Sequence, residues 1–324
     1  MTSMQAVVTG AGGFIGRALC ERLCSAGTRV IALHRRSRPG PWAAEIIHDL
    51  VTGPPPADAL AGVDTVFHLA GNAHVSGGAK CDGLHRENSV IGTNNLLTAC
   101  GPQIRRFTYI SSVKAIGEST PVAGLDESAT PRPTTAYGRA RLEAEGLVLA
   151  TASTRHAVVL RLPLVYGPGM KGNLKRMLHG LASGHMPRFP DLGSRRSMVH
   201  VQDVCNAAIA AIANTALTGR VYLIADGEAY SLPRLQAAMC AALGRPLPRI
   251  ALSHWMLRLA AAGGDLLGTL GRRPVPFDSV ALQRLTQSAL YHGDRACADF
   301  GFAPRRQFED ALGEVVEVMR DSAS

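Results

Sequence analysis

The segment Thr9-Gly10-Ala11-Gly12-Gly13-Phe14-Ile15-Gly16, near the start of the chain, predicts a glycine-rich turn between a strand and a helix. The turn stands between an apolar run at 5–8, typical of a strand, and an amphipathic run at 17–25, typical of a helix. The spacing of Gly10, Gly13 and Gly16 lets a backbone without Cβ atoms turn sharply, approach a pyrophosphate and pack the new helix on the strand. The helix N-terminus then presents free N–H groups and a positive dipole end to phosphates. This arrangement is typical of a dinucleotide-binding turn.

Length and composition describe an ordinary globular protein. The 324 residues are ample for a large core, and 46% of them are hydrophobic. The net charge of +9 comes from scattered arginines without an aromatic-interleaved basic patch, so we expect a phosphate-bearing small substrate and no nucleic acid. The seven cysteines lack zinc-ligand spacing, and the first strand leaves no room for a signal peptide. We therefore expect buried thiols, no metal and a cytoplasmic location.

Strand and helix patterns alternate through the first half of the chain. Strand-like runs occur at 29–33, 65–69, 107–111 and 157–162, and helical patterns at 89–100 and 136–150. Such alternation predicts an α/β fold with a Rossmann-type doubly wound parallel sheet over residues 1–168. Beyond Pro168-Gly169 the elements are shorter and predict a smaller α/β substrate domain over 169–324, partly interleaved with the first.

The most apolar later segment covers residues 255–270. Arg258 and Asp265 interrupt it, and it is too short to span a bilayer, so no transmembrane segment is expected. It could lie on a membrane surface, but we favour a packed helix pair.

Two further segments bring hydroxyl groups to the end of the predicted sheet. Ser111-Ser112 ends a strand, and Tyr137 opens the helix that follows. In doubly wound sheets, strand ends and helix starts both face the crevice that binds ligands. The sequence therefore predicts that Ser112 and Tyr137 lie in one site.

With the glycine turn, these segments resemble one family, the extended short-chain dehydrogenase/reductases, in the branch of NAD(P)-dependent nucleotide-sugar epimerases, dehydratases and 4-ketoreductases. The resemblance covers nearly the whole chain. It rests on Thr9 to Gly16, His68-Leu69-Ala70-Gly71, Asn88, Gly92-Thr93-Asn94-Asn95-Leu96, Ser111-Ser112, Tyr137, RLPLVYGP at 161–168, Gly172-Asn173 and Arg196-Ser197-Met198-Val199-His200-Val201.

The resemblance implies roles for individual residues. Ser112 would hydrogen-bond the substrate oxygen at C4, while Tyr137 exchanges the proton and the nicotinamide exchanges the hydride. Arg141 stands where the family has a lysine against the nicotinamide ribose. The implied cofactor contacts are Gly10, Gly12, Gly13, Phe14, Ile15, Gly16, His34, Arg35, Arg36, Asp49, Leu50, Leu69, Ala70, Gly71, Asn88, Tyr137 and Arg141. The implied substrate contacts are Ser112, Val113, Asn173 and Arg196.

Three departures from the family pattern refine the chemistry. Arg141 keeps the charge of the usual lysine, but its planar fork bonds differently to a ribose diol. Val113-Lys114 replaces the acidic pair with which related dehydratases eliminate water, so dehydration is not expected. The second strand ends in His34-Arg35-Arg36, where an NAD enzyme places an acid on the ribose 2′-hydroxyl. Arginines there accommodate a 2′-phosphate, so NADP is favoured over NAD.

The sequence and the resemblance together predict NADP(H)-dependent hydride transfer at C4 of a nucleotide-activated hexose, UDP-linked and feeding polysaccharide or glycoside assembly. A 4-ketoreductase is favoured over a 4-epimerase, because a reductase needs its tyrosine only as an acid. The alternative is a catalytically impaired relative that binds NADP as a sensor or scaffold, for which Arg141 is the sequence support. We expect a homodimer through two helices, with apolar surface from Val90, Leu96, Leu97, Leu142, Leu147, Val148 and Leu149.

Overall fold

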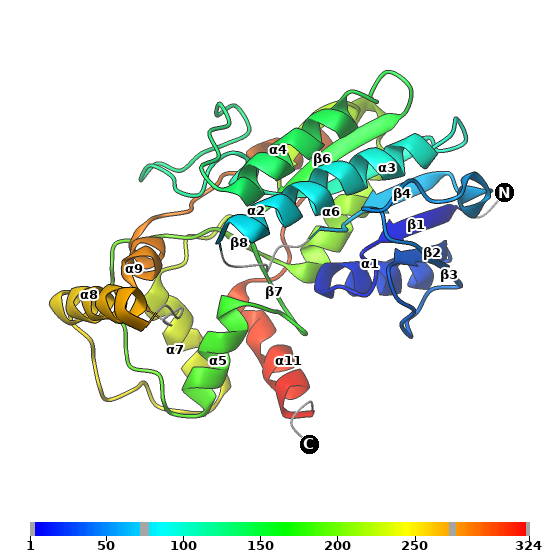
Figure 1. Ribbon diagram of the computed structural model, residues 1–324. Coiled ribbons are helices and arrows are strands. Elements are labelled where there is room, and N and C mark those ends of the chain that lie inside the picture. The colour runs from blue at the N-terminus through cyan, green and yellow to red at the C-terminus, as the bar shows by residue number, and fades with distance from the viewer. Residues whose placement is uncertain (1–3, 72–77, 272–276, 322–324) are drawn as a thin grey trace.

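The computed structural model describes residues 4–71, 78–271 and 277–321. Its main sheet has the strand order β3-β2-β1-β4-β5-β6-β9, and each neighbouring pair is parallel (Figure 1). The strands are β1 (Gln5–Thr9), β2 (Arg29–His34), β3 (Ala44–Ile47), β4 (Thr65–His68), β5 (Arg106–Ser112), β6 (His156–Leu162) and β9 (Arg220–Leu223). The predicted doubly wound parallel sheet is confirmed, with the strand order reversing between β1 and β4.

Both faces of the sheet are apolar and covered by helices (Figure 1). In β1, Ala6 and Val8 point into one cluster and Val7 into the other, as period-two alternation requires. The first cluster is covered by α1 (Phe14–Ser25) and α6 (Val201–Ala213). The second is covered by α3 (Gly92–Ala99) and α4 (Ala136–Leu149). A π-helical turn, η2 (Glu87–Ile91), joins α3 to the preceding α2 (Gly78–Arg86).

A second cluster of elements lies below one end of the sheet in Figure 1. It contains the two-stranded parallel sheet of β7 (Leu164–Tyr166) and β8 (Met198–His200), with α5 (Asn173–Ala182), α7 (Leu232–Ala242) and α11 (Phe308–Asp321) around its own core. The chain also returns to the main sheet, because α6 packs on one face of that sheet and β9 forms its last strand. Helix α10 (Asp294–Phe300) packs near β9. The domain boundary at 168 stays a prediction.

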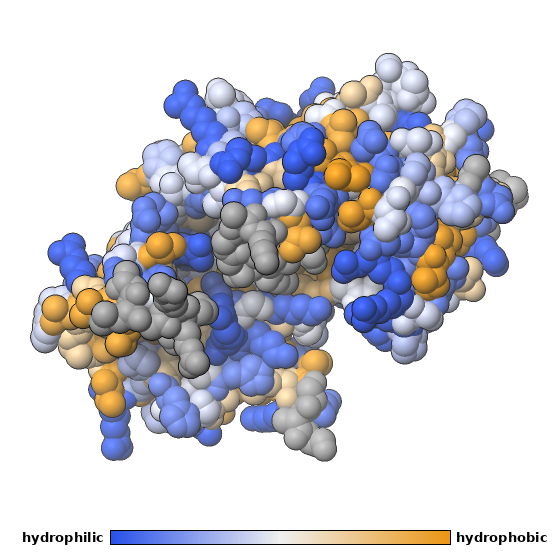
Figure 2. Space-filling model, in the orientation of Figure 1, coloured by the Kyte–Doolittle hydropathy of each residue, from blue (hydrophilic) through white to orange (hydrophobic). Residues whose placement is uncertain are grey.

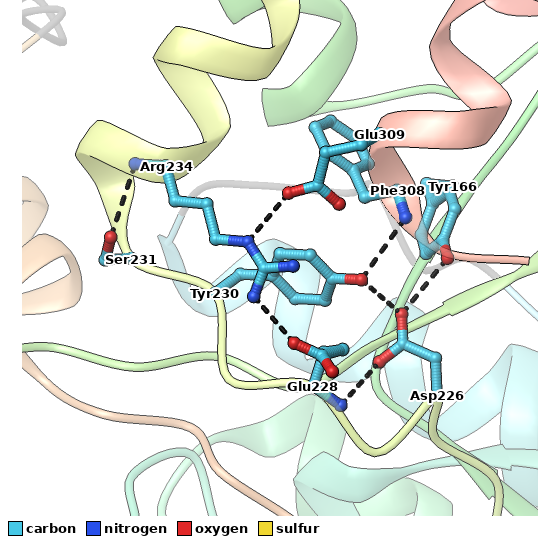
Figure 3. Close-up of polar contacts among 8 residues, drawn as sticks. All are labelled: Tyr166, Asp226, Glu228, Tyr230, Ser231, Arg234, Phe308 and Glu309. Carbon is cyan, nitrogen blue, oxygen red and sulfur yellow. Dashed lines mark hydrogen bonds and ion pairs between the residues drawn. The ribbon is translucent and has the colours of Figure 1, made fainter.

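The buried carboxylate of Asp226 connects β7, the segment after β9 and α11 through hydrogen bonds (Figure 3). Asp226, just after β9, accepts hydrogen bonds from the hydroxyls of Tyr166 at 3.1 Å and Tyr230 at 2.8 Å. The Phe308 N–H at the start of α11 donates to the Tyr230 hydroxyl at 3.3 Å. Burial raises the pKa of Asp226 to about 6 against the opposing hydrogen bonds. The C-terminal helix is therefore anchored to the ends of β7 and β9.

Residues 255–270 form most of α8 (His254–Gly271), which lies against α9 (Ser279–Thr286). The Asp265 carboxylate accepts a hydrogen bond from the Ser279 N–H at 3.1 Å. The predicted packed helix pair is confirmed. Within the described ranges, no helix combines the length and the apolar character needed to cross a membrane.

The expected dimer surface is smaller than the sequence suggested. Val90, Leu96 and Val148 are 6%, 0% and 0% exposed, and they pack inside the protein. The expectation was wrong for these three side chains, because a helix that covers a sheet buries its most apolar stripe inward. Partly exposed side chains remain at Leu97, Leu142, Leu147 and Leu149. The homodimer itself stays a prediction.

Candidate active site

The predicted glycine turn connects β1 to α1. Gly10 has φ +68°, and a Cβ there would lie 3.1 Å from the Ala70 nitrogen. A Cβ at Gly16 would overlap the Gly10 carbonyl oxygen, so α1 approaches the turn this closely only without a side chain. The Gly13 N–H donates to the Gly10 carbonyl at 2.9 Å. The turn thus lies beside the carboxyl end of β4, at the reversal of strand order.

The start of α1 offers main-chain N–H groups to a ligand. Gly13 occupies the N-cap and supplies no side-chain hydrogen bond to the first turn. Phe14 packs against both the main core and the core around α5 and α7, and Ile15 packs against the main core. Their side chains therefore fix the helix, while the first-turn N–H groups fit a pyrophosphate.

A hydrogen-bonded chain holds the end of β4 against β1. The Thr9 hydroxyl accepts from the N–H groups of Leu69 and Ala70 at 3.1 and 3.0 Å, so its own proton is donated to Nδ1 of His68 at 2.7 Å. Nε2 of His68 then donates to the Thr93 hydroxyl at 2.9 Å. Complete burial lowers the pKa of His68 to about 3, so the ring is neutral and structural.

The segment after β2 is organised by Glu45 of β3. Its carboxylate pairs with Nε2 of His34 at 3.1 Å and accepts from the Ser37 hydroxyl at 2.5 Å and the Trp42 indole N–H at 2.9 Å. These hydrogen bonds, that of Ser37 first, lower the pKa of Glu45 to about 2. The His34 ring is thus held by Glu45, and its contact with a 2′-phosphate stays a prediction.

An arginine beyond the predicted set lies against the glycine turn. Cδ of Arg38 is 3.0 Å from the place where a Cβ on Gly12 would stand. Arg35, Arg36 and Arg38 are all exposed, but of the three only Arg38 is placed against the turn. Residues 37–40 and 42–45 line an open depression of about 500 Å³. The cofactor contacts predicted from the sequence include His34, Arg35 and Arg36 but not Arg38 or Glu45. Arg38 could have been predicted, because it is the third arginine of Arg35-Arg36-Ser37-Arg38.

Asp49, Leu50 and Asn88 each make a contact within the fold. The Asp49 carboxylate accepts from the main-chain N–H two residues later at 3.0 Å. The carbonyl of buried Leu50 accepts from Asn95 at 2.7 Å. Asn88 lies in the π-helical turn and donates to the Leu84 carbonyl at 2.7 Å. Their cofactor contacts stay predictions.

Ser112 ends β5 next to the first turn of α4. Its hydroxyl accepts from the Lys114 N–H at 3.3 Å, which begins the short helix η3 (Val113–Ala115). A Cβ on Gly138 would overlap the Lys114 carbonyl oxygen, so a glycine lets α4 touch this segment. The Lys114 ammonium lies 5.6 Å from the centre of the Tyr137 ring. The fold therefore brings the Ser112 and Tyr137 segments together.

Tyr137 and Arg141 lie one turn apart on α4. Nε of Arg141 donates to the Tyr137 hydroxyl at 3.2 Å. Its Nη1 donates to the Tyr109 hydroxyl at 2.9 Å and the Ile110 carbonyl at 3.3 Å. Arg141 is 4% exposed; burial opposes its charge, but the two tyrosine hydroxyls outweigh burial and raise its pKa. Arg141 is therefore a permanent cation beside Tyr137.

Gly71 shows where the rest of the guanidinium lies. Its φ is +155°, and a Cβ there would overlap Nη2 of Arg141 and lie 2.9 Å from Cζ. Nη2 thus stands at the end of β4, the side on which the resemblance places the nicotinamide ribose. Whether this nitrogen replaces the usual lysine toward the ribose stays a prediction.

A buried ion pair holds α4 against β6. The Ser111 hydroxyl donates to the Glu145 carboxylate at 2.5 Å, and Glu145 pairs with Arg161 of β6 at 2.7 Å. Glu145 and Arg161 are 1% and 5% exposed. This pair sets α4 relative to β5 and β6, and so sets Tyr137 relative to Ser112. The sequence interpretation missed both Glu145 and Tyr109, because a single acid in a helix and a tyrosine in a strand carry no distinguishing signal.

One more aromatic contact reaches Tyr137. The His85 ring of α2 meets the Tyr137 ring edge-on, with centres 5.3 Å apart. His85 is 8% exposed. It was also missed, because its helix precedes α4 by some fifty residues in the sequence.

The predicted substrate residues lie in three different settings. The Val113 side chain packs among Ile116, Leu223 and Tyr291, which leaves only its main chain for a substrate. Asn173, at the start of α5, accepts a hydrogen bond from Arg176. Arg196 donates to the Arg284 carbonyl at the end of α9, and burial lowers its pKa. Neither polar residue is shown facing Ser112, and both substrate contacts stay predictions.

This arrangement suits proton exchange at an oxygen. A fixed cation beside the Tyr137 hydroxyl stabilises the phenolate that remains when the proton leaves. The Ser112 hydroxyl lies at the neighbouring strand end, and its contact with the same oxygen stays a prediction. The glycine turn, at the adjoining strand end, has a helix N-terminus suited to phosphates, and its contact with a cofactor stays a prediction.

Comparisons with known proteins agree with this geometry. The family model described as "NAD dependent epimerase/dehydratase family" matches residues 6–225. A 2-alkyl-3-oxoalkanoate reductase of Stenotrophomonas maltophilia (strain K279a) is 31% identical, over 95% of this chain and 97% of its own. A 3-beta-hydroxysteroid dehydrogenase of Mycolicibacterium neoaurum is 27% identical, over 97% of this chain and 91% of its own.

Among solved structures, MoeE5 in complex with UDP-glucose and NAD has a TM-score of 0.80 and 26% identity, over 99% of this chain and 100% of that one. The fold, the family model and the relatives together indicate an NAD(P)-dependent oxidoreductase or epimerase. The chain belongs to the NAD-dependent epimerase/dehydratase family.

Proposed function

We propose that the protein is an NADP(H)-dependent reductase that acts on a ketone held between Ser112 and Tyr137. The observation that carries this proposal is the 3.2 Å contact between the Tyr137 hydroxyl and buried, charged Arg141. When bound, NADPH supplies the hydride to the carbonyl carbon. Tyr137 gives its proton to the carbonyl oxygen, Ser112 hydrogen-bonds that oxygen, and Arg141 stabilises the phenolate by ~4 kcal/mol at ~4 Å and an effective dielectric of ~20.

The preference for NADP rests on positive charge near the glycine turn. The sequence has no acid at the end of β2, where Arg35 and Arg36 follow as exposed side chains, and Arg38 lies against Gly12 of the turn. The carboxylate at this place, Glu45 of β3, is engaged by His34, Ser37 and Trp42. The complex of the similar MoeE5 contains NAD, so the cofactors need direct comparison. We expect NADPH to bind at least about tenfold more tightly than NADH, and Arg38→Ala to remove most of that difference. Tighter binding of NADH would refute the preference and favour an epimerase.

The first candidate substrate is a nucleotide-activated 4-keto hexose, reduced at C4. The similarity to a structure holding UDP-glucose supports it, and the resemblance assigns Asn173 and Arg196 to the substrate. Reduction is preferred over epimerisation because NADP is a consumed co-substrate in most reductases, whereas an epimerase retains one cofactor. On this proposal the enzyme serves polysaccharide or glycoside assembly in the cytoplasm.

A second candidate substrate is an apolar ketone. The reductase and the steroid dehydrogenase named above match nearly the whole chain, and their names describe an alkyl-substituted keto acid and a hydroxysteroid, both with large apolar parts. The polar groups of Asn173 and Arg196 are engaged by Arg176 and by the Arg284 carbonyl, which a phosphate ligand would have to displace.

One assay compares the candidates. NADPH oxidation is followed with UDP-4-keto-hexose, a 2-alkyl-3-oxoalkanoate and a 3-ketosteroid, for the wild type and Tyr137→Phe. We expect turnover with one class and a loss of at least about a hundredfold in Tyr137→Phe, because general acid catalysis is removed. NADPH binding without turnover of any ketone would favour the sensor or scaffold.

A further inference from the structure

Helix α8 presents an apolar face to solvent. Trp255, Leu259 and Leu267 are each 63% exposed, and Met256 is 36% exposed. At about 100° per residue, these four side chains project from one side of the helix. Large apolar side chains gathered on an exposed helix face indicate an interaction surface.

The opposite side of α8 is firmly packed. Leu257 and Ala261 are 2% and 1% exposed. A Cβ on Gly264 would overlap the Phe277 carbonyl oxygen, so the chain before α9 lies directly against the helix. The outward face is therefore a fixed property of the fold, because the inward face is already used.

The segments that flank α8 also expose apolar side chains. Ile250, four residues before α8, is 71% exposed, and Val280 on α9 is 51% exposed. We call Trp255, Met256, Leu259 and Leu267 the α8 face. In Figure 2, orange side chains lie over α8 and α9 at the left edge, next to blue ones.

The surroundings of the α8 face are cationic. The only carboxylates in residues 244–287 are Asp265 and Asp278, and both accept hydrogen bonds from the first turn of α9. In the part of the chain that the structure describes, four arginines of α8 and the segments on either side of it form no ion pair with a carboxylate. They are Arg245, Arg249, Arg258 and Arg284.

We propose that the α8 face docks the protein on an anionic lipid bilayer, with α8 lying in the plane of the headgroups. Trp255 suits the headgroup boundary, because its ring is amphipathic, and Leu259 and Leu267 reach the acyl region. The arginines pair with lipid phosphates. A second copy of the chain fits this face less well, because it would bring the same arginines together. The proposal is independent of the substrate class.

Binding to vesicles tests the proposal. The full chain is sedimented with vesicles of phosphatidylcholine alone and with vesicles that also contain phosphatidylglycerol. We expect binding to the anionic vesicles that is at least about tenfold tighter and weakens with salt. The double variant Trp255→Ser/Leu259→Ser should lose at least about tenfold in vesicle affinity, while its NADPH affinity is unchanged. The matched control is Val122→Ser, which alters a 94% exposed valine elsewhere.

Tryptophan fluorescence locates the contact. The chain has two tryptophans, Trp42 and Trp255, so Trp42→Phe leaves Trp255 as the reporter. A blue shift with anionic vesicles alone is expected. Absence of vesicle binding, or equal binding by the double variant, would overturn the proposal. So would a wild-type oligomer that the double variant dissociates in light scattering, because the face would then bind a second copy.

Discussion

Removal of the charge on Arg141 while its bulk is kept should nearly abolish reduction. In Arg141→Met, the cation beside the Tyr137 hydroxyl is lost, and a phenolate would form without its partner. The interaction of two unit charges ~4 Å apart at an effective dielectric of ~20 is ~4 kcal/mol, so we expect a fall of about a thousandfold in kcat/KM.

Arg141→Lys should retain activity, because it keeps the charge near the same atoms. A lysine ammonium is one bond beyond the position of Nε, so it lies where Cζ of Arg141 now stands, between the hydroxyls of Tyr137 and Tyr109. The charge is then conserved within hydrogen-bonding reach, although the bond to the Ile110 carbonyl is weakened. We expect a loss of no more than about tenfold, which corresponds to ~1.4 kcal/mol.

The assay is steady-state NADPH oxidation with the ketone that gives the highest turnover in the substrate comparison. Thermal unfolding of each variant shows whether a loss of activity follows from a loss of fold. Activity of Arg141→Met within tenfold of the wild type would refute the reasoning. So would an Arg141→Lys variant as slow as Arg141→Met, because the guanidinium geometry would then matter more than its charge.

Three further substitutions test residues that hold the elements of the site in place. Folding raises the pKa of Asp226 from 3.8 to about 6, so the protonated carboxyl stabilises the fold fully below about pH 4, and this stabilisation is lost as pH rises through 6. Urea titrations at several pH values should show that Asp226→Asn removes ~3 kcal/mol of the pH dependence of the free energy of unfolding. The same pH dependence in the wild type and the variant would contradict this prediction. Glu145→Gln should lower the free energy of unfolding by ~3 kcal/mol because it leaves Arg161 buried without its partner, and an unchanged urea midpoint would be inconsistent with that role. Gly71→Ala should lower kcat/KM by at least about tenfold by displacing the Arg141 guanidinium, and wild-type kinetics would show that the guanidinium can move freely.

Much of the fold was predictable because its signals are local. The runs at 29–33, 65–69, 107–111 and 157–162 correspond to β2, β4, β5 and β6, since apolar β-branched strands in a parallel sheet are buried on both faces. Strands β3 and β9 went unpredicted, because each is short, contains a charged residue (Glu45 and Arg220) and is only partly buried, so neither shows a continuous apolar run. The π-helical turn at η2 likewise has no local signature that separates it from a helix.

The sequence alone determined the glycine turn, because Gly13 and Gly16 are required by close contacts with the Gly10 carbonyl inside a single strand-turn-helix unit and Gly10 by its positive φ. It also determined that Tyr137 and Arg141 share a helix face, because four residues make about one turn. Only the tertiary structure decided what the Arg141 charge touches, since Tyr109 and Ile110 belong to β5 and Gly71 to the segment after β4. Contacts of that kind depend on how strands distant in sequence pack against one helix, and no local pattern encodes them.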